Sequence, residues 1–272
     1  MPDRYAVIGN PVLHSKSPRI HAQFARTTGH DLVYEHLLAP LDGFLATVEA
    51  FQRGGGRGLN VTVPFKLEAF ALAALHSSRA QLAGAVNTLL REDDGRWYGD
   101  NTDGAGLVRD LTENLGLDPR DARILVLGAG GAARGVIGPL LDCLPRTLAV
   151  ANRTHTKAQA LAERFAPLGP IRALAIAELH DHAFDLVVNA TSVGLASEAH
   201  DWPPSVFAPG AFAYDLVYSD QPTQFVRWAQ AHGAARTADG LGMLIEQAAE
   251  SYHLWRGVRP HTAPVFALLR PR

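Results

Sequence analysis

The glycines and small residues between 128 and 133 are of the types that bind a pyrophosphate. The run Leu125–Arg134 reads as an apolar strand that turns sharply into a helix, which we expect to begin near Ala132. Such a turn points backbone N–H groups and the positive helix end at an anion. Gly128 permits the tight turn, Gly130 lets a diphosphate approach the backbone, and Ala133 occupies the third small position. The predicted binding loop consists of Gly128, Ala129, Gly130, Gly131 and Ala132.

The end of the next predicted strand, Thr147–Ala151, indicates which dinucleotide is bound. A chain that binds NAD usually carries an acidic residue there for the ribose 2′-hydroxyl. Asn152 and Arg153 stand at this position instead, followed by Thr154 and Lys157. Because a guanidinium suits a 2′-phosphate, the pattern predicts NADP rather than NAD.

Polar clusters in the first half of the chain lie where a strand or loop ends and a helix begins. The first is Ser15-Lys16-Ser17-Pro18. Two hydroxyls beside a helix N-terminus can hold a small carboxylate by donating hydrogen bonds. A pair of serines that cap a helix is the simpler interpretation of this cluster by itself.

The second cluster, Asn60 to Lys66, places a lysine at the start of a helix. Strand periodicity puts Asn60 and Thr62 on one face, and a helix begun by Pro64 projects Lys66 from its first turn. A cation there is electrostatically unfavourable, and a destabilised ammonium is readier to act as an acid or base. A solvated surface lysine is the alternative.

The third cluster combines Asn87 with Asn101-Thr102-Asp103. Asn87 lies in the otherwise apolar strand predicted over Ala85–Leu90, where a buried amide needs partners. Asp103 begins the next helix, so helix capping explains it. A carboxylate that also pairs with Lys66 would hold that ammonium in place.

Alternating strand and helix patterns must position these clusters. They predict an α/β protein with two domains: an N-terminal, mostly parallel α/β substrate domain and a Rossmann-type dinucleotide-binding domain. We expect the substrate and catalytic domain to span residues 1–103 and to be completed by C-terminal helices in 240–272. A connector helix and the NADP-binding domain are expected over 104–239.

Composition excludes several other classes. The 272 residues are 47% hydrophobic and 19% charged, with a formal net charge of −2, so we expect no binding to nucleic acid or membranes. Met1–Arg4 runs directly into the strand Tyr5–Gly9 without a signal-peptide pattern, which favours a cytoplasmic protein. Cys143 is the only cysteine, and the histidines lack metal-ligand spacing, so no metal site is predicted.

Taken in order, these segments resemble the shikimate dehydrogenase family. In the first half the resemblance rests on Val7-Ile8-Gly9-Asn10-Pro11, Ser15-Lys16-Ser17-Pro18, Asn60-Val61-Thr62-Val63-Pro64-Phe65-Lys66, Ala85-Val86-Asn87-Thr88 and Gly99-Asp100-Asn101-Thr102-Asp103-Gly104. In the second half it rests on Gly128–Arg134, Asn152-Arg153-Thr154, Asn189-Ala190-Thr191-Ser192, Tyr214-Asp215-Leu216-Val217-Tyr218 and Asp239-Gly240-Leu241-Gly242-Met243-Leu244. The match runs nearly end to end.

The resemblance implies an NADP-dependent oxidoreductase that acts on a CH–OH group and reversibly reduces 3-dehydroshikimate to shikimate in aromatic amino-acid biosynthesis (the chorismate pathway). Lys66 would be the acid/base, with Asp103 as its partner. The implied substrate residues are Ser15, Ser17 and Tyr218 around the carboxylate and Asn60, Thr62, Asn87, Asp103 and Gln247 at the ring hydroxyls. Gly240 and Met243 would border the nicotinamide, and Thr191 would belong to the same cofactor site. A monomer or homodimer is expected.

Three alternatives remain. In a dual quinate/shikimate dehydrogenase a threonine often replaces Ser17 and an acid replaces Arg153, so both residues favour shikimate and NADP. A protein that only senses NADP or a metabolite would not need Lys66 and Asp103. A methylenetetrahydrofolate-type dehydrogenase has a similar arrangement, but the serine cluster and Asn60 to Lys66 suit a small polyhydroxy acid better than a pterin.

Overall fold

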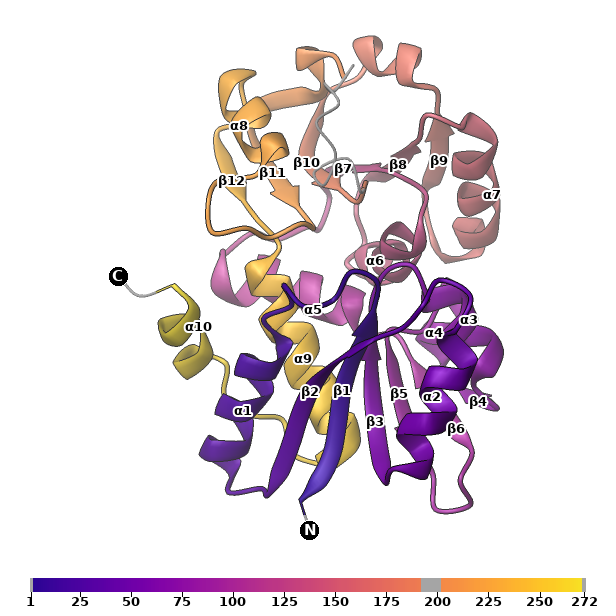
Figure 1. Ribbon diagram of the computed structural model, residues 1–272. Helices are drawn as coiled ribbons and strands as arrows, with labels where there is room; N and C mark the ends of the chain where they lie inside the picture. The colour runs from indigo at the N-terminus through magenta and orange to yellow at the C-terminus, as the bar shows by residue number, and fades with distance from the viewer. Residues whose placement is uncertain (1, 192–201, 271–272) are drawn as a thin grey trace. The chain divides into compact units, whose positions relative to one another are not determined.

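The computed structural model describes residues 2–191 and 202–270 of the chain (Figure 1). The chain divides into two compact units, each built around its own six-stranded sheet. The first unit consists of Met1–Gly106 with Leu244–Arg272, and the second of Leu107–Met243. The α/β fold class is as predicted. Within the described ranges no helix has both the length and the apolar character needed to cross a membrane.

The sheet of the first unit is mixed, with the strand order β2-β1-β3-β5-β6-β4. Its strands are β1 (Asp3–Gly9), β2 (Leu32–Leu38), β3 (Gly56–Val61), β4 (Leu75–His76), β5 (Thr88–Arg91) and β6 (Trp97–Asp100). β1 pairs in parallel with β2 and β3, whereas β3–β5 and β5–β6 are antiparallel. Asn60, Thr88 and Asp100 are therefore neighbours in register at one edge of the sheet.

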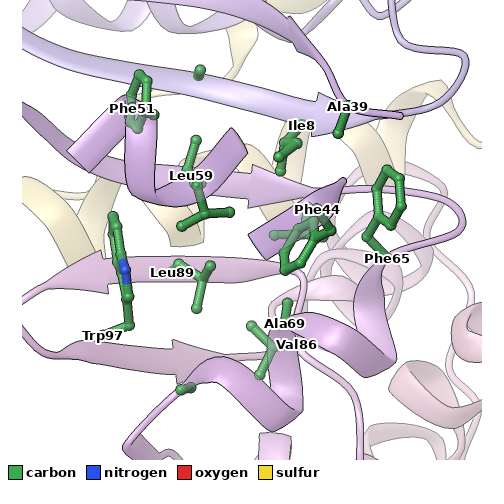
Figure 2. Close-up of a cluster of buried hydrophobic side chains, with 14 of the residues drawn as sticks. Ile8, Ala39, Phe44, Phe51, Leu59, Phe65, Ala69, Val86, Leu89 and Trp97 are labelled. Atoms are coloured by element: carbon green, nitrogen blue, oxygen red, sulfur yellow. The ribbon is translucent and has the colours of Figure 1, made fainter. Parts of the chain in front are cut away.

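The helices of this unit cover both faces of the sheet. They are α1 (Ser17–Thr28), α2 (Phe44–Arg53), α3 (Lys66–Leu72), α4 (Ser78–Ala83), α5 (Asp103–Arg109), α9 (Leu241–Arg256) and α10 (Ala263–Leu269). Figure 2 shows the core beneath α2 and α3, where Phe44, Phe65 and Ala69 pack against Ile8 and Leu89. Side chains alternate along β1, so Tyr5 lies on the face of the sheet opposite Ile8, where it stacks on Trp255 of α9.

Among the predicted boundaries that differ from the structure, two concern candidate site residues in the first unit. The strand predicted from Ala85 begins only at Thr88, so Asn87 precedes β5 although its backbone is bonded to Asp100 and Val61. The helix predicted from Pro64 begins at Lys66, because Phe65 N–H bonds to the Thr62 carbonyl and closes a turn first.

The second unit has a fully parallel sheet with the strand order β12-β11-β10-β7-β8-β9. Its strands are β7 (Arg123–Leu127), β8 (Thr147–Ala151), β9 (Ile171–Leu174), β10 (Phe184–Asn189), β11 (Phe207–Asp215) and β12 (Arg236–Ala238). Its helices are α6 (Gly131–Asp142), α7 (His155–Phe165) and α8 (Gln224–Ala231), and a π-helical turn, η1 (Asp110–Asn114), continues α5. Counted along the chain from β7, the order is the 3-2-1-4-5-6 arrangement of dinucleotide-binding folds.

Candidate active site and cofactor site

Polar side chains lie close together at the end of the first sheet where β1, β3 and β6 end and β5 begins; we call this end of the sheet the polar edge. Thr62 N–H bonds to the Ile8 carbonyl at 2.9 Å, which joins the segment after β3 to the end of β1. β5 starts, and β6 ends, at the same edge, so Asn87 and Asp103 lie beside the end of β3. The antiparallel strands β5 and β6 thus place polar residues at the same end of the sheet as the carboxyl ends of the parallel strands β1 and β3.

Lys66 and Asp103 form an ion pair at this end of the sheet. Lys66 is the first residue of α3 and Asp103 the first of α5, and Lys66 Nζ donates to Asp103 Oδ2. Their side chains are only 15% and 7% exposed, respectively. The solvated-lysine alternative is therefore wrong: the ammonium at this helix start is compensated by a buried carboxylate.

A single backbone donor fixes the orientation of the Asn87 amide. Thr102 N–H donates to Asn87 Oδ1 at 2.8 Å, so this atom must be the oxygen. The Asn87 NH₂ then donates to Asp103 Oδ1 at 2.7 Å. Asp103 consequently has one oxygen bonded to Asn87 and the other to Lys66, which holds the carboxylate and the ammonium in one arrangement.

A buried hydroxyl network extends this cluster to α9. Ser251 Oγ donates to the Gln247 carbonyl at 3.0 Å and accepts from Asn60 Nδ2 at 2.8 Å. Thr88 Oγ1 lies 2.8 Å from the Ser251 hydroxyl and donates to Asn87 Oδ1 at 2.8 Å. Gln247, one turn before Ser251, places Oε1 3.3 Å from Asn87 Nδ2. The structure therefore brings together Asn60, Asn87, Asp103, Lys66 and Gln247.

Sequence reasoning missed three members of the network. Thr88 and Thr102 stand in recognised motifs but received no role, and Ser251 received none at all. All three are fully buried. The spacing of Gln247 and Ser251, which lie four residues apart in α9 and so share one face of the helix, is the signal that could have indicated a role for Ser251.

The serine cluster lies in the segment between β1 and α1. Ser17 begins α1 and is 3% exposed, and Ser15 Oγ donates to Ser17 Oγ at 3.1 Å. His36 of β2 holds the segment, because its Nε2 lies 2.9 Å from the Ser15 carbonyl oxygen. The two hydroxyls are thus adjacent beside the start of a 12-residue helix.

The glycine turn of the second unit has the features that a dinucleotide site needs. Gly128 has φ +107°, and a Cβ there would lie 2.9 Å from the Ala190 carbonyl carbon. A Cβ at Gly130 would meet no described atom within 4 Å, so the space before α6 is open. Ala129, Gly131 and Ala132 complete this turn into the helix. An open approach to a helix N-terminus suits a pyrophosphate.

The segment after β8 presents basic and polar groups to solvent. Asn152 Nδ2 bonds to the Thr154 carbonyl at 2.9 Å, and Thr154 precedes α7. Arg153 and Lys157 are both exposed. Arg134, in the first turn of α6, is a basic residue without a predicted role. Burial, and then the like charge of Arg164, lower the pKa of its guanidinium, an environment that a bound anion would relieve.

The remaining predicted residues of this unit follow its other strands. Thr191 Oγ1 donates to Asn189 Oδ1 at 2.7 Å just after β10, whereas Ser192 lies outside the described residues. Tyr218 is half-buried in the segment after β11. Gly240 and Met243 are buried around the start of α9. Within 2–191 and 202–270, no group of three or more His, Cys, Asp or Glu side chains could hold a metal ion.

Fold and site together define a two-domain α/β oxidoreductase with a dinucleotide-binding unit. Comparison with known proteins makes the assignment specific. Residues 7–89 match the shikimate dehydrogenase substrate binding domain, residues 110–196 match shikimate/quinate 5-dehydrogenase, and residues 240–266 match the shikimate 5′-dehydrogenase C-terminal domain. The chain belongs to the shikimate dehydrogenase family.

Individual relatives are similar over their whole length. A shikimate dehydrogenase (NADP(+)) of Alkalilimnicola ehrlichii is 57% identical over 271 residues and covers 100% of both chains. The crystal structure of an Ael1 enzyme from Pseudomonas putida has 47% identity and a TM-score of 0.91, covering 99% of each chain. A Thermus thermophilus shikimate 5-dehydrogenase in complex with NADP(H) and shikimate has 38% identity and a TM-score of 0.84, covering 96% of each.

Proposed function

We propose that this chain is an NADP-dependent shikimate dehydrogenase that reversibly reduces 3-dehydroshikimate to shikimate, with Lys66 as the acid/base and Asp103 as its partner. The observation that carries the proposal is the shielded Lys66–Asp103 ion pair, whose carboxylate is fixed by Asn87. The names of the relatives and the shikimate bound by the Thermus thermophilus enzyme support the choice of substrate.

Proton transfer at the carbonyl oxygen is the task of Lys66. A bound NADPH would supply the hydride, and negative charge would then develop on the ketone oxygen. A proton donor beside that oxygen lowers the barrier. An ammonium has three N–H donors, so the bond to Asp103 leaves others for the substrate. In the oxidation direction the Lys66 amine accepts the proton of the hydroxyl group.

Substrate recognition is assigned to the rest of the polar edge. Asn60, Thr62, Asn87 and Gln247 would bind the ring hydroxyls together with Asp103. Ser15 and Ser17 would bind the carboxylate, because their adjacent hydroxyls combine with the partial positive charge of the α1 N-terminus. Tyr218 would also lie near that carboxylate.

The dinucleotide is assigned to the glycine turn and to the segment after β8. Gly128, Ala129, Gly130, Gly131 and Ala132 would bind the diphosphate. Asn152, Arg153, Thr154 and Lys157 would bind the 2′-phosphate, with Thr191, Gly240 and Met243 in the remainder of the site. Residues 1–103 completed by 240–272 would thus form the substrate and catalytic domain, and residues 104–239 the connector helix and the NADP-binding domain, with Gly240 and Met243 adding to the NADP site from the start of the returning segment.

Absorbance at 340 nm tests the proposal directly. Purified protein is given shikimate or quinate, each with NADP⁺ or NAD⁺. Rapid reduction with shikimate and NADP⁺ only is the expected result. Comparable rates with quinate would assign the chain to the dual-specificity enzymes, and no reduction in any of the four mixtures would refute the catalytic proposal.

A further inference from the structure

Tyr214 joins the two segments by which the chain enters and leaves the second unit. Its side chain is fully buried in β11, and its hydroxyl donates to Asp110 Oδ2 at 2.6 Å. Met243 N–H donates to the Tyr214 hydroxyl oxygen at 3.2 Å. Asp110 lies just after the entry at Leu107, and Met243 is the last residue of the unit. One phenol therefore links both segments within the same unit.

Close packing reinforces this link at two glycines. A Cβ at Gly242 would lie 2.0 Å from Asp110 Oδ1, and a Cβ at Gly240 would lie 2.3 Å from the Leu216 carbonyl oxygen. The backbone of this segment thus rests directly on the Asp110 carboxyl group and on the chain that leaves β11. Glycine is required here for space, since neither residue has a left-handed φ.

The chemistry of the link favours one direction of hydrogen bonding. Burial, and then the negative charge of Asp110, raise the pKa of Tyr214 well above its usual value, so the phenol stays protonated and donates to the carboxylate. Asn114 Nδ2 donates to the other Asp110 oxygen at 2.9 Å from within the π-helical turn η1. Single π-helical turns often occur at functional sites.

The strand order indicates which part of a dinucleotide this link affects. The segment Asp239–Met243 follows β12, at one end of the sheet, whereas Arg153 follows β8, on the opposite side of the β7 glycine turn. If the diphosphate lies at that turn, the two nucleoside halves extend to opposite sides of it. The 2′-phosphate half then belongs to Arg153, and the nicotinamide half to the segment after β12.

We propose that Tyr214 and Asp110 are positioning residues that hold Gly240 and Met243 for the nicotinamide half of NADP. The inference rests on the proposed function, in which these two residues border the nicotinamide. Removing the phenolic hydroxyl should loosen that half of the site and leave the binding of the 2′-phosphate half unchanged.

Calorimetric titration of Tyr214→Phe with two ligands tests this inference. NADP⁺ contains both halves, whereas 2′,5′-ADP contains the 2′-phosphate half without nicotinamide. We expect the Kd for NADP⁺ to rise about tenfold and the Kd for 2′,5′-ADP to stay within about twofold of wild type. Tyr252→Phe is the matched control, because Tyr252 is equally buried and its hydroxyl bonds to Thr28 and His30 in the first unit.

An equal loss for both ligands, or no loss for NADP⁺, would overturn the inference. Circular dichroism identifies a temperature at which the variants are folded. Asp110→Asn keeps the side-chain size and provides a second test if Tyr214→Phe does not fold; we expect the same selective loss for NADP⁺. Failure of the proposed NADP site is distinguishable, since wild-type protein would then bind neither ligand, and failure of the proposed activity would appear as no reduction at 340 nm with NADP⁺ still bound.

Discussion

At the scale of single residues, Asp103 joins the Lys66 ammonium to the buried amide of Asn87. One of its oxygens accepts from Lys66 and the other from Asn87, whose amide is itself oriented by Thr102 N–H. Charge-assisted hydrogen bonds of this kind are about twice as strong as neutral ones. The ammonium therefore has little freedom to move away from Asp103, as its proposed role of proton donor requires.

Lys66→Ala should lower kcat for shikimate by about 10²–10⁴-fold, because that is the usual contribution of a general acid/base. KM for shikimate should stay nearer to the wild-type value, since Ser15, Ser17 and the amide network remain. Steady-state kinetics at 340 nm measures both constants. A folded variant with near-normal turnover would exclude Lys66 from the mechanism.

Ser251→Ala should raise KM for shikimate about fivefold with little change in KM for NADP⁺. The reason is that Asn60 loses the hydroxyl acceptor that orients its amide. Ser205→Ala is a suitable control, because Ser205 is exposed and its hydroxyl donates to the His180 carbonyl in the second unit. An unchanged KM for shikimate would show that the hydrogen bond from Asn60 to Ser251 of α9 is not needed to orient the Asn60 amide for the substrate.

Arg153→Gln should raise KM for NADP⁺ about tenfold and leave KM for NAD⁺ nearly unchanged. A guanidinium that binds the 2′-phosphate contributes only to the phosphorylated dinucleotide. Arg120→Gln, another exposed arginine in the same unit, controls for the loss of net charge. Parallel changes for both dinucleotides would mean that Arg153 does not read the 2′-phosphate.

At the scale of elements, the segment that leads from β6 to α5 is held by an ion pair. Asp100 is 3% exposed, and Arg79 of α4 binds both of its oxygens, at 2.7 and 2.6 Å. Burial opposes the charged form of Asp100, but the bonds from Arg79 outweigh it and lower the pKa of the carboxyl group. Asp100 in turn accepts from Asn101 N–H, two residues before Asp103. The pair thus anchors the segment that presents Asp103.

Arg79→Gln should lower the free energy of unfolding at pH 7 by about 2 kcal/mol, less than for a fully buried pair because Arg79 is partly exposed. A lowered folded-state pKa stabilises the protein above the ordinary pKa of the group, and that stabilisation is lost as pH falls through the lowered value. The variant should therefore lose less stability than wild type between pH 7 and pH 3. Urea unfolding at both pH values measures this; equal losses would contradict it.

At the scale of the whole molecule, the chain enters the second unit at Leu107 and leaves it after Met243, so the first unit is completed only by residues 244–272. Gln247 and Ser251 belong to that returning segment. The polar edge of the first unit is therefore assembled only after the second unit has been synthesised. A truncation after Met243 would remove Gln247 and Ser251 from the network around Asn60 and Asn87.

Saturation with NADP⁺ should stabilise the whole protein by mass action, by about 2.7 kcal/mol at a hundred times its Kd. NAD⁺ at the same concentration should stabilise it less, because it lacks the 2′-phosphate. Tryptophan fluorescence can follow thermal unfolding in both parts of the chain, since Trp97 and Trp255 lie in the first unit and Trp202 and Trp228 in the second. Equal stabilisation by the two dinucleotides would contradict the predicted preference.

The sequence by itself was sufficient for features whose residues are adjacent along the chain. The glycine turn after β7 and the basic segment after β8 each occupy a few consecutive residues, so strand periodicity and residue type define them without tertiary information. The alternation of strands and helices likewise predicted the α/β class.

Tertiary structure alone decided which distant side chains meet. Ser251 bonds to Asn60 across 191 residues, and Asn87 reaches Gln247 across 160, because α9 returns to the first sheet. Strand patterning predicted Asn87 within a strand, whereas it immediately precedes β5, and its partners and the orientation of its amide depend on the Thr102 backbone and on Asp103. Helix and strand periodicities report which face of an element is buried. They do not report which other element lies against that face, and the pairing of Lys66 with Asp103 became definite only once that packing was known.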